Sequence, residues 1–113
     1  QTDAEQQETA EWLKELKQAI EKGIASEDFS VEQLAIQIPM SRTALYNKVK
    51  SATGLTPNQL MMEIRLQKAR AYLTENPRLT NKQVMKLVGL KHEPHFIQVF
   101  FRRFGYTPGQ MKN

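Results

Sequence analysis

Apolar residues recur at helical spacing through most of the chain, and residues 56–76 carry them on more than one face. At about 100° per residue, Met62 and Leu66 share one stripe of this segment, whereas Leu60 and Ile64 lie roughly opposite it. A helix that is apolar in several directions is usually buried from several directions. The pattern therefore predicts either a core helix of a bundle or a connector held by a subdomain at each end.

Both ends of this predicted helix carry short-range signals. Thr56 suits the N-cap, Pro57 fits the first turn, and Gln59 completes the spacing of a capping box. At the other end, Asn76 precedes Pro77, and a residue before proline avoids the helical region of backbone conformation. We therefore expect one uninterrupted helix between these two signals.

The two flanks of the central helix repeat one another. Ser30 and Gln33 have capping-box spacing, which predicts the start of a short amphipathic helix. Thr80 and Gln83 repeat this signal in the second flank. The apolar residues of the two short helices are Leu34, Ala35 and Ile38 in the first copy, and Val84, Leu87 and Val88 in the second. Such self-similarity indicates an internal duplication.

A second helix is predicted in each copy, at residues 42–53 and at about residues 93–104. The inward-facing positions of the two helices correspond, Leu45 with Phe96 and Val49 with Phe100. Each copy then closes with a similar tetrapeptide, GLTP in the first and GYTP in the second. A short helix, a tight turn and a longer second helix have the dimensions of a helix-turn-helix.

The whole pattern predicts an all-α fold with about seven helices, because no segment alternates apolar and polar residues over the length of a strand. We expect the first helix to begin near Thr9 and to end near Gly23, after a frayed polar segment, with Trp12 packed against the domain. The predicted organisation is an acidic linker and N-terminal helix at 1–29, a first helix-turn-helix at 30–55, a connecting helix at 56–76, and a second helix-turn-helix with a C-terminal helix at 77–113.

Composition narrows the possible functions of the 113 residues. The absence of cysteine excludes disulfides and thiolate metal sites, and two histidines are too few for a structural metal site. We find no membrane span and no signal peptide, so we expect a cytoplasmic protein. The sequence offers no nucleophile–base pair, phosphate-binding glycine loop or carboxylate cluster. We therefore expect neither an enzyme nor a cofactor.

Charge divides the chain into two parts. Residues 1–30 hold eight acids against three lysines, whereas residues 31–113 hold thirteen Lys and Arg against four acids. The net charges are therefore −5 and +9. The basic charge of residues 31–113, which follow the acidic leader at residues 1–30, favours a polyanionic partner such as double-stranded DNA.

The first predicted helix-turn-helix has a suitable outward surface for DNA. In this motif the second helix enters the major groove and its outer side chains meet base edges. The candidate DNA-binding residues of the first copy are Ser41, Arg42, Thr43, Tyr46, Asn47 and Lys50. Arginine pairs with guanine and asparagine with adenine, and a capping serine leaves backbone amides near a phosphate. The alternative is an ordinary solvated face, with Tyr46 packed flat on the surface.

The second predicted helix-turn-helix carries different candidate residues on its outward surface. Its candidate DNA-binding residues are His92, His95, Gln98, Arg102 and Arg103. Of these, His95 and Gln98 are candidates for reading bases, and the arginines for holding phosphates. Glu93 is either an acceptor from a cytosine amino group or structural, and Phe101 is expected to cover the core or a neighbouring helix.

From Ser30 to Gln110 the sequence resembles the DNA-binding domain of the AraC-type (arabinose-regulator) transcription factors. The residues that carry the resemblance are Met40, Ser41 and Arg42, Leu45 to Lys48, Gly54 to Pro57, Arg65 and Leu66, Ala69, Leu73, Gly89 and Leu90, Phe96, Phe100, and Phe104 to Pro108. The resemblance implies two helix-turn-helix units joined by a rigid helix and acting in promoter recognition. The preceding segment is similar to the version that is fused to hybrid two-component sensor proteins. We expect Arg65 to be structural, with its head group paired locally.

Two functions remain open from the sequence. The first is a sequence-specific DNA-binding domain of a transcription regulator, which follows or is fused to a sensor or dimerisation region. The alternative is a helical protein–protein module that binds RNA polymerase or a sensor partner without binding DNA. The operator, the inducing signal and the choice between activation and repression stay open.

Overall fold

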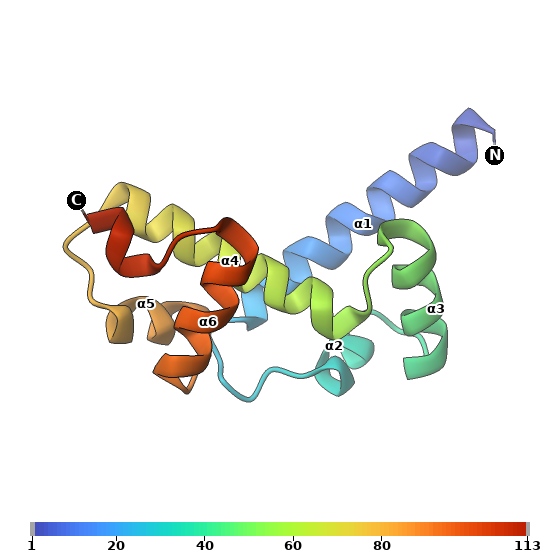
Figure 1. The fold of residues 1–113 in the computed structure, drawn as a ribbon. Helices are drawn as coiled ribbons and strands as arrows, with labels where there is room; N and C mark the ends of the chain where they lie inside the picture. The colour runs from blue at the N-terminus through green and yellow to red at the C-terminus, as the bar shows by residue number, and fades with distance from the viewer. Residues whose placement is uncertain (1, 113) are drawn as a thin grey trace.

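We describe the fold from a computed structural model, in which residues 2–112 are placed. The elements, in chain order, are α1 (Asp3–Gly23), α2 (Val31–Gln37), α3 (Arg42–Thr53), α4 (Pro57–Glu75), α5 (Asn81–Val88), α6 (Glu93–Phe104) and a final 3-10 helix, η1 (Pro108–Lys112). This placed part of the chain contains no strand, which confirms the all-α prediction. The molecule is elongated, measuring 47 × 29 × 21 Å along its principal axes (Figure 1).

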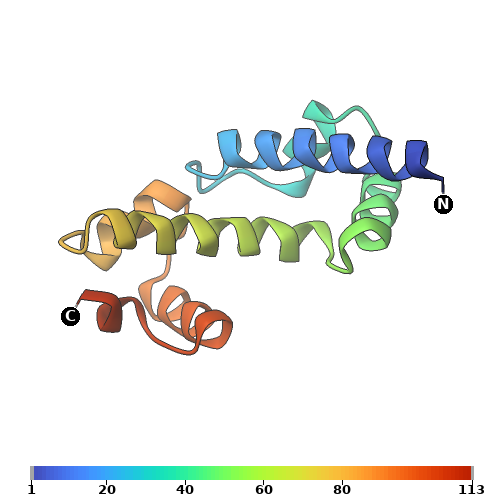
Figure 2. The same ribbon diagram turned by 90° about the horizontal axis from the view of Figure 1, so that it is seen from above.

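Helix α4 lies across the middle of the molecule, with α2 and α3 near one end and α5 and α6 near the other (Figures 1 and 2). Its predicted capping box is present: the Gln59 backbone N–H donates to Thr56 Oγ1 at 3.2 Å, and the Thr56 N–H donates to Gln59 Oε1 at 2.9 Å. The helix ends at Glu75, with Asn76 as its C-cap. Both predicted ends are therefore confirmed.

Two separate hydrophobic cores share this one helix. The N-terminal half of α4 contributes Leu60, Met61 and Ile64 to a first core built with α1, α2 and α3. The C-terminal half contributes Leu66, Ala69 and Leu73 to a second core built with α5 and α6. Of the two roles that the sequence left open for this helix, the connector is the one observed.

The first core is aliphatic at its centre. Leu16 and Ile20 of α1 and Leu45 and Val49 of α3 have no exposed surface. Trp12 packs at its edge, as predicted, and the Lys48 ammonium lies 4.4 Å from the centre of the indole ring. Helix α1 thus packs in the first core together with α2 and α3.

The second core is aromatic. Phe96 and Phe100 are fully buried, and Phe100 makes edge-to-face contacts with Phe104 at 4.7 Å and Tyr106 at 5.9 Å between ring centres. Of the three apolar residues named from the sequence on this short helix, Leu87 is 41% exposed and lies outside this core. The buried arc of the short α5 spans Val84, Met85 and Val88, and at 100° per residue Leu87 falls beside that arc rather than within it.

One predicted helix start and one predicted capping box need correction. Helix α1 begins at Asp3 rather than near Thr9, because Thr2 Oγ1 accepts a hydrogen bond from the Glu5 backbone N–H at 3.2 Å. Acidic residues in this first turn also interact favourably with the helix dipole. At α2, the Ser30 hydroxyl accepts from the Gln33 N–H at 3.4 Å without a reciprocal bond among the described contacts, so this capping box is only half formed.

Candidate nucleic-acid interface

Helix α3 is held so that its outer surface faces solvent. The Ser41 hydroxyl caps it by accepting from the Ala44 backbone N–H at 3.1 Å, and Leu45 and Val49 anchor its inner stripe in the first core. All six residues proposed from the sequence on this helix and its cap are exposed. The Tyr46 side chain is 46% exposed, so its ring is only partly packed against the protein.

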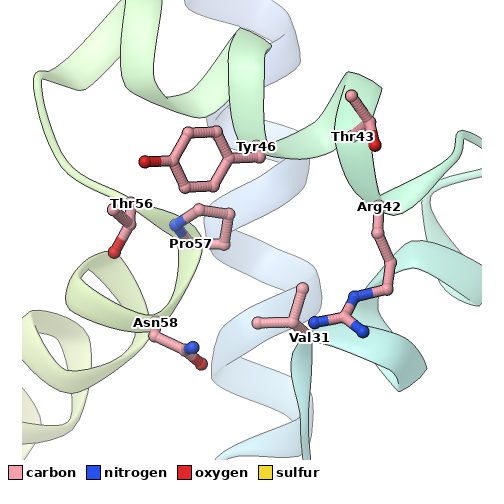
Figure 3. A pocket seen from close by; sticks show the side chains of 7 residues that line it. All are labelled: Val31, Arg42, Thr43, Tyr46, Thr56, Pro57 and Asn58. Carbon is pink, nitrogen blue, oxygen red and sulfur yellow. The ribbon is translucent and has the colours of Figure 1, made fainter.

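An open cavity of about 610 Å³ lies between the starts of α3 and α4 (Figure 3). The side chains that line it are Val31, Arg42, Thr43, Tyr46, Thr56, Pro57 and Asn58. Two helix N-termini therefore border one concave surface that also carries three of the proposed DNA-binding residues. Asn58 was not predicted from the sequence, where residues 56–59 were interpreted only as a helix cap.

Arg42 points towards the start of α2 (Figure 3). There its guanidinium Nη1 lies 3.0 Å from Glu32 Oε1. The pKa of Glu32 lies below its usual range, first because of a backbone hydrogen bond, then because of Ser30 and Arg42. Both side chains are more than half exposed, and such pairs contribute little to stability. Arg42 can therefore leave Glu32 for another anion at small cost.

Lys50 lies near the other end of the same surface. Its ammonium donates to the Gly54 carbonyl at 3.2 Å, at the C-terminus of α3. The side chain stays exposed, and a lysine at this end of a helix interacts favourably with the helix dipole.

Helix α6 presents a second exposed surface. Its inner stripe is formed by Phe96 and Phe100, and His92, His95, Gln98 and Arg102 are exposed. At 100° per residue, His95, Gln98 and Arg102 fall on one outward arc of α6. His92 occupies the N-cap without making a side-chain capping bond, so its imidazole is not used to close the helix.

Arg103 lies to the side of that arc and is engaged within the protein. Its Nε donates to Glu63 Oε1 of α4 at 2.6 Å, and its guanidinium lies 4.9 Å from the Phe104 ring centre. Sequence periodicity did not reveal this contact, because the two residues are forty positions apart. A phosphate contact by Arg103 would have to share the guanidinium with Glu63.

The Glu63–Arg103 pair predicts a pH dependence of stability. The pKa of Glu63 lies below its ordinary 4.5, first because Arg103 donates to its carboxylate. A carboxyl group with a depressed folded-state pKa stabilises the fold above its unfolded-state pKa and loses this effect as pH falls through the folded-state pKa. At pH 7 we expect Glu63→Gln to be less stable than the wild type by less than about 1 kcal/mol, since the Arg103 side chain is 45% exposed and solvent weakens the ion pair.

This stability difference should close in urea titrations carried out at progressively lower pH below 4.5. Glu75→Gln, at an exposed position on the same helix, is the matched control and should show a smaller difference. A Glu63→Gln difference that stays constant down to pH 3 would exclude a titrating role of the carboxylate.

Phe101 differs from its prediction. The side chain is 51% exposed and is not among the residues packed on the second core. Its angular position on α6 is close to that of Gln98, three residues earlier, which places it on the outward arc. The expectation that Phe101 covers the core is therefore wrong.

Arg65 is structural, as expected, but its partner is distant in sequence. The side chain is buried, with 9% of its surface exposed, and its Nη2 donates to the Ser26 carbonyl at 3.3 Å. Burial lowers the pKa of its guanidinium. The expected local pairing is replaced by a contact with the segment between α1 and α2.

The placed residues contain neither a metal-ligand cluster nor a membrane-spanning helix. In the stretch from residue 2 to residue 112, histidine, aspartate and glutamate side chains nowhere gather in threes to hold a metal ion. None of the helices placed there combines the length and the apolar character that a membrane span needs.

Two helix-turn-helix units, each with an exposed second helix and joined by one central helix, define a DNA-binding domain of the transcription-regulator class. Residues 34–113 match the protein family described as "Helix-turn-helix domain". The chain belongs to this family and is of the AraC type, which confirms the resemblance found in the sequence.

Individual relatives agree with this assignment. The chain is 37% identical over 101 residues to histidine kinase P4 of Formosa agariphila, covering 89% of this chain and 7% of that protein. It is 32% identical over 86 residues to the HTH-type transcriptional regulator MtrA of Neisseria gonorrhoeae, covering 76% of this chain and 28% of that protein. The chain thus spans a minor part of these relatives.

Solved structures share the same fold. One is the C-terminal domain of the two-component response regulator yesN from Fusobacterium nucleatum, with 25% identity and a TM-score of 0.77, covering 89% of this chain and 98% of that one. Another is a DNA-binding transcriptional dual regulator from Escherichia coli K-12, with 25% identity and a TM-score of 0.76, covering 86% and 85% of the two chains.

Proposed function

We propose that the chain recognises a promoter sequence by placing α3 and α6 in successive major-groove segments on one face of double-stranded DNA. The observation that carries this proposal is the position of the two exposed helices, one on each core, near opposite ends of α4. The 19 residues of α4 give it a length of about 28 Å at 1.5 Å per residue. One turn of B-DNA repeats the major groove after about 34 Å, which is compatible with this span.

In this proposal each candidate residue of α3 contacts a base or a phosphate according to the hydrogen bonds and charge of its side chain. Asn47 pairs with an adenine, Arg42 pairs with a guanine or a phosphate, and Lys50 neutralises a phosphate. Thr43 and Tyr46 contribute a hydroxyl or an apolar contact, and the capped N-terminus at Ser41 supplies backbone amides to a phosphate.

On α6, His95 and Gln98 read bases while Arg102 holds a phosphate at the rim. His92 lies at the entry of this helix and contacts the backbone of the duplex. Arg103 shares its charge between Glu63 and a nearby phosphate.

For the whole protein, we propose the output end of a two-component regulator in the cytoplasm, controlled by a sensor or dimerisation region. The similarity to a histidine kinase and to the C-terminal domain of a response regulator supports this role. Contact with RNA polymerase is a further proposed partnership of the regulator.

A salt titration tests the proposed binding. Binding-site selection with residues 1–113 would first yield a preferred duplex. Affinity for it should then fall steeply as salt rises, because lysine and arginine contacts to phosphates release counterions. Absence of binding, or binding without salt dependence, would favour the alternative of a protein–protein module.

Two substitutions on α3 should have different effects on binding. Asn47→Ala removes a base contact and should reduce discrimination at one base pair by about 1–3 kcal/mol. Lys50→Ala removes a phosphate contact and should weaken binding to all sequences alike, with a shallower salt slope. Affinities for a panel of single-base variants of the selected duplex measure both effects.

Lys17→Ala provides the charge-matched control, since Lys17 is exposed on α1 rather than on α3. It should leave discrimination unchanged. If Asn47→Ala lowered affinity equally for every duplex, the base-reading role of Asn47 would be wrong.

A further inference from the structure

Residues 24–29, which join α1 to α2, contact both helix-turn-helix units. We propose that this segment, named the brace here, fixes the angle between α3 and α6 and thereby determines which half-site spacing the chain accepts. The inference rests on the proposed function, because it concerns how two DNA-reading helices are set relative to each other. The brace lies outside residues 34–113, the part of the chain that matches the family model.

The brace is anchored in the first unit by its two ends. Ile24 is 3% exposed and Phe29 is 7% exposed, and both belong to the first core. Between them, the Ser26 backbone N–H donates to the Gly23 carbonyl at 3.0 Å, and the Phe29 N–H donates to the Ser26 carbonyl at 3.3 Å. The segment is therefore a compact turn with a defined position.

The outer side of this turn lies against the second unit at Gly89. A Cβ atom built on Gly89 would lie 1.9 Å from the Ile24 carbonyl oxygen and 2.9 Å from that of Ser26. Gly89 is also the C-cap of α5 and has φ +76°. Only glycine permits both this backbone conformation and this close approach of two main chains.

The brace also reaches the middle of the connector. The buried guanidinium of Arg65 donates from Nη2 to the Ser26 carbonyl at 3.3 Å. Arg65 follows Ile64 of the first core and precedes Leu66 of the second, so it lies where α4 passes from one unit to the other. This hydrogen bond ties the brace to the junction of the two units.

Charge adds to the contact at the surface. Lys91, which precedes α6, lies 3.7 Å from the Asp28 carboxylate, and Glu27 shares an open cavity with Lys86 and Lys91. The exposed Asp28–Lys91 pair contributes little energy, but its two charges have complementary signs. The acidic end of the leader thus faces basic residues of the second unit.

A helix that joins two units fixes the distance between them. It leaves their relative orientation less well fixed, because each unit can tilt where it packs on that helix. The brace contacts both α4 and the turn between α5 and α6, so it connects the first unit to the second at an additional place. This additional connection restrains the tilt of the second unit, and with it the direction in which α6 faces relative to α3. We therefore assign Arg65 and Gly89 as positioning residues rather than DNA contacts.

The test uses residues 1–113 and a set of duplexes built on the selected site. One carries both half-sites at the selected spacing, two others have one base pair inserted or deleted between them, and a fourth retains only the half-site of α3. One base pair turns the second half-site by about 34–36° around the duplex, so the wild type should lose about tenfold or more in affinity on the altered spacings.

Arg65→Met keeps the bulk of the side chain and removes the hydrogen bond to Ser26, and Gly89→Ala forces the two main chains apart. Both variants should reduce the spacing penalty to about threefold or less while binding the single half-site as the wild type does. Gly54→Ala and Gly105→Ala are matched controls, because these glycines have φ +77° and +82° but open space around the added Cβ. They should keep the wild-type spacing profile.

If Gly89→Ala fails to fold, as judged by circular dichroism, Arg65→Met alone decides the result. An unchanged tenfold spacing penalty in the folded variants, or an equal loss of affinity on every duplex, would overturn the brace. A wild type that binds the selected duplex but tolerates every spacing would overturn the brace and leave the proposed function intact. A wild type that selects no duplex would overturn the proposed function itself.

Discussion

Phe100→Ala is expected to unfold the second helix-turn-helix unit while the first remains folded. Phe100 is fully buried and contacts three other aromatic rings, those of Phe96, Phe104 and Tyr106. Replacing a core phenylalanine by alanine costs about 3–5 kcal/mol, because apolar transfer energy is lost and a cavity remains. For a unit of this size, at about 0.05–0.15 kcal/mol per residue, that cost is comparable to the whole stability.

The chain contains a convenient probe for this experiment. Trp12 is the single tryptophan and packs on the first core, so its fluorescence reports the first unit, whereas circular dichroism reports all helices. In urea titrations of Phe100→Ala, helix signal should be lost well before the Trp12 signal changes. The control is Phe101→Ala, the adjacent residue of the same type, which is half exposed and should cost less than about 1 kcal/mol.

Coincident fluorescence and circular-dichroism transitions in Phe100→Ala would show that the two cores unfold as one unit. Equal destabilisation by Phe100→Ala and Phe101→Ala would contradict the packing described for the second core.

Ala69→Pro should abolish specific binding to a two-half-site duplex, even if both halves of α4 remain helical. Ala69 is fully buried in the interior of α4. Proline there removes one backbone hydrogen bond and clashes with the carbonyl four residues earlier, at Arg65, at a cost of about 3 kcal/mol or more. The resulting kink changes both the distance and the angle between the two reading helices.

Affinity for the two-half-site duplex, compared with affinity for the α3 half-site alone, measures this effect. The Ala69→Pro variant should bind the two-half-site duplex no more tightly than the single α3 half-site, and its affinity for the single half-site should be that of the wild type. Ala71→Gly, at an exposed position two residues later, costs only about 1 kcal/mol of helix stability and should preserve two-site binding. Retained two-site specificity in Ala69→Pro would mean that α4 does not set the spacing.

Much of the fold was predictable because its signals are local. Caps at Thr56 and Thr80 and the periodic apolar residues located α3, α4, α5 and α6 almost to the residue. The exposure of the candidate residues on α3 followed from the burial of Leu45 and Val49, since helical geometry fixes the angles between side chains.

The parts that were missed depend on contacts between residues far apart in the chain. Periodicity gives the angular positions of Leu87 on α5 and Phe101 on α6. It does not tell which side of each helix the rest of the protein buries, and both residues lie just outside the buried side. The pairing of Arg103 with Glu63 and of Arg65 with Ser26 joins positions about forty residues apart, and no local pattern specifies them. The role of residues 24–29 was hidden for the same reason.

The shared helix α4 has a consequence for how the sequence can change over time. Surface loops accept insertions, but one residue added to α4 between its two cores would turn the whole second unit by about 100° and advance it by about 1.5 Å. Such a change would point α6 away from the duplex face that we propose α3 reads, even with every side chain of both units kept. Under the proposed two-helix recognition, the number of residues in α4 should therefore tolerate change as poorly as the side chains that touch DNA.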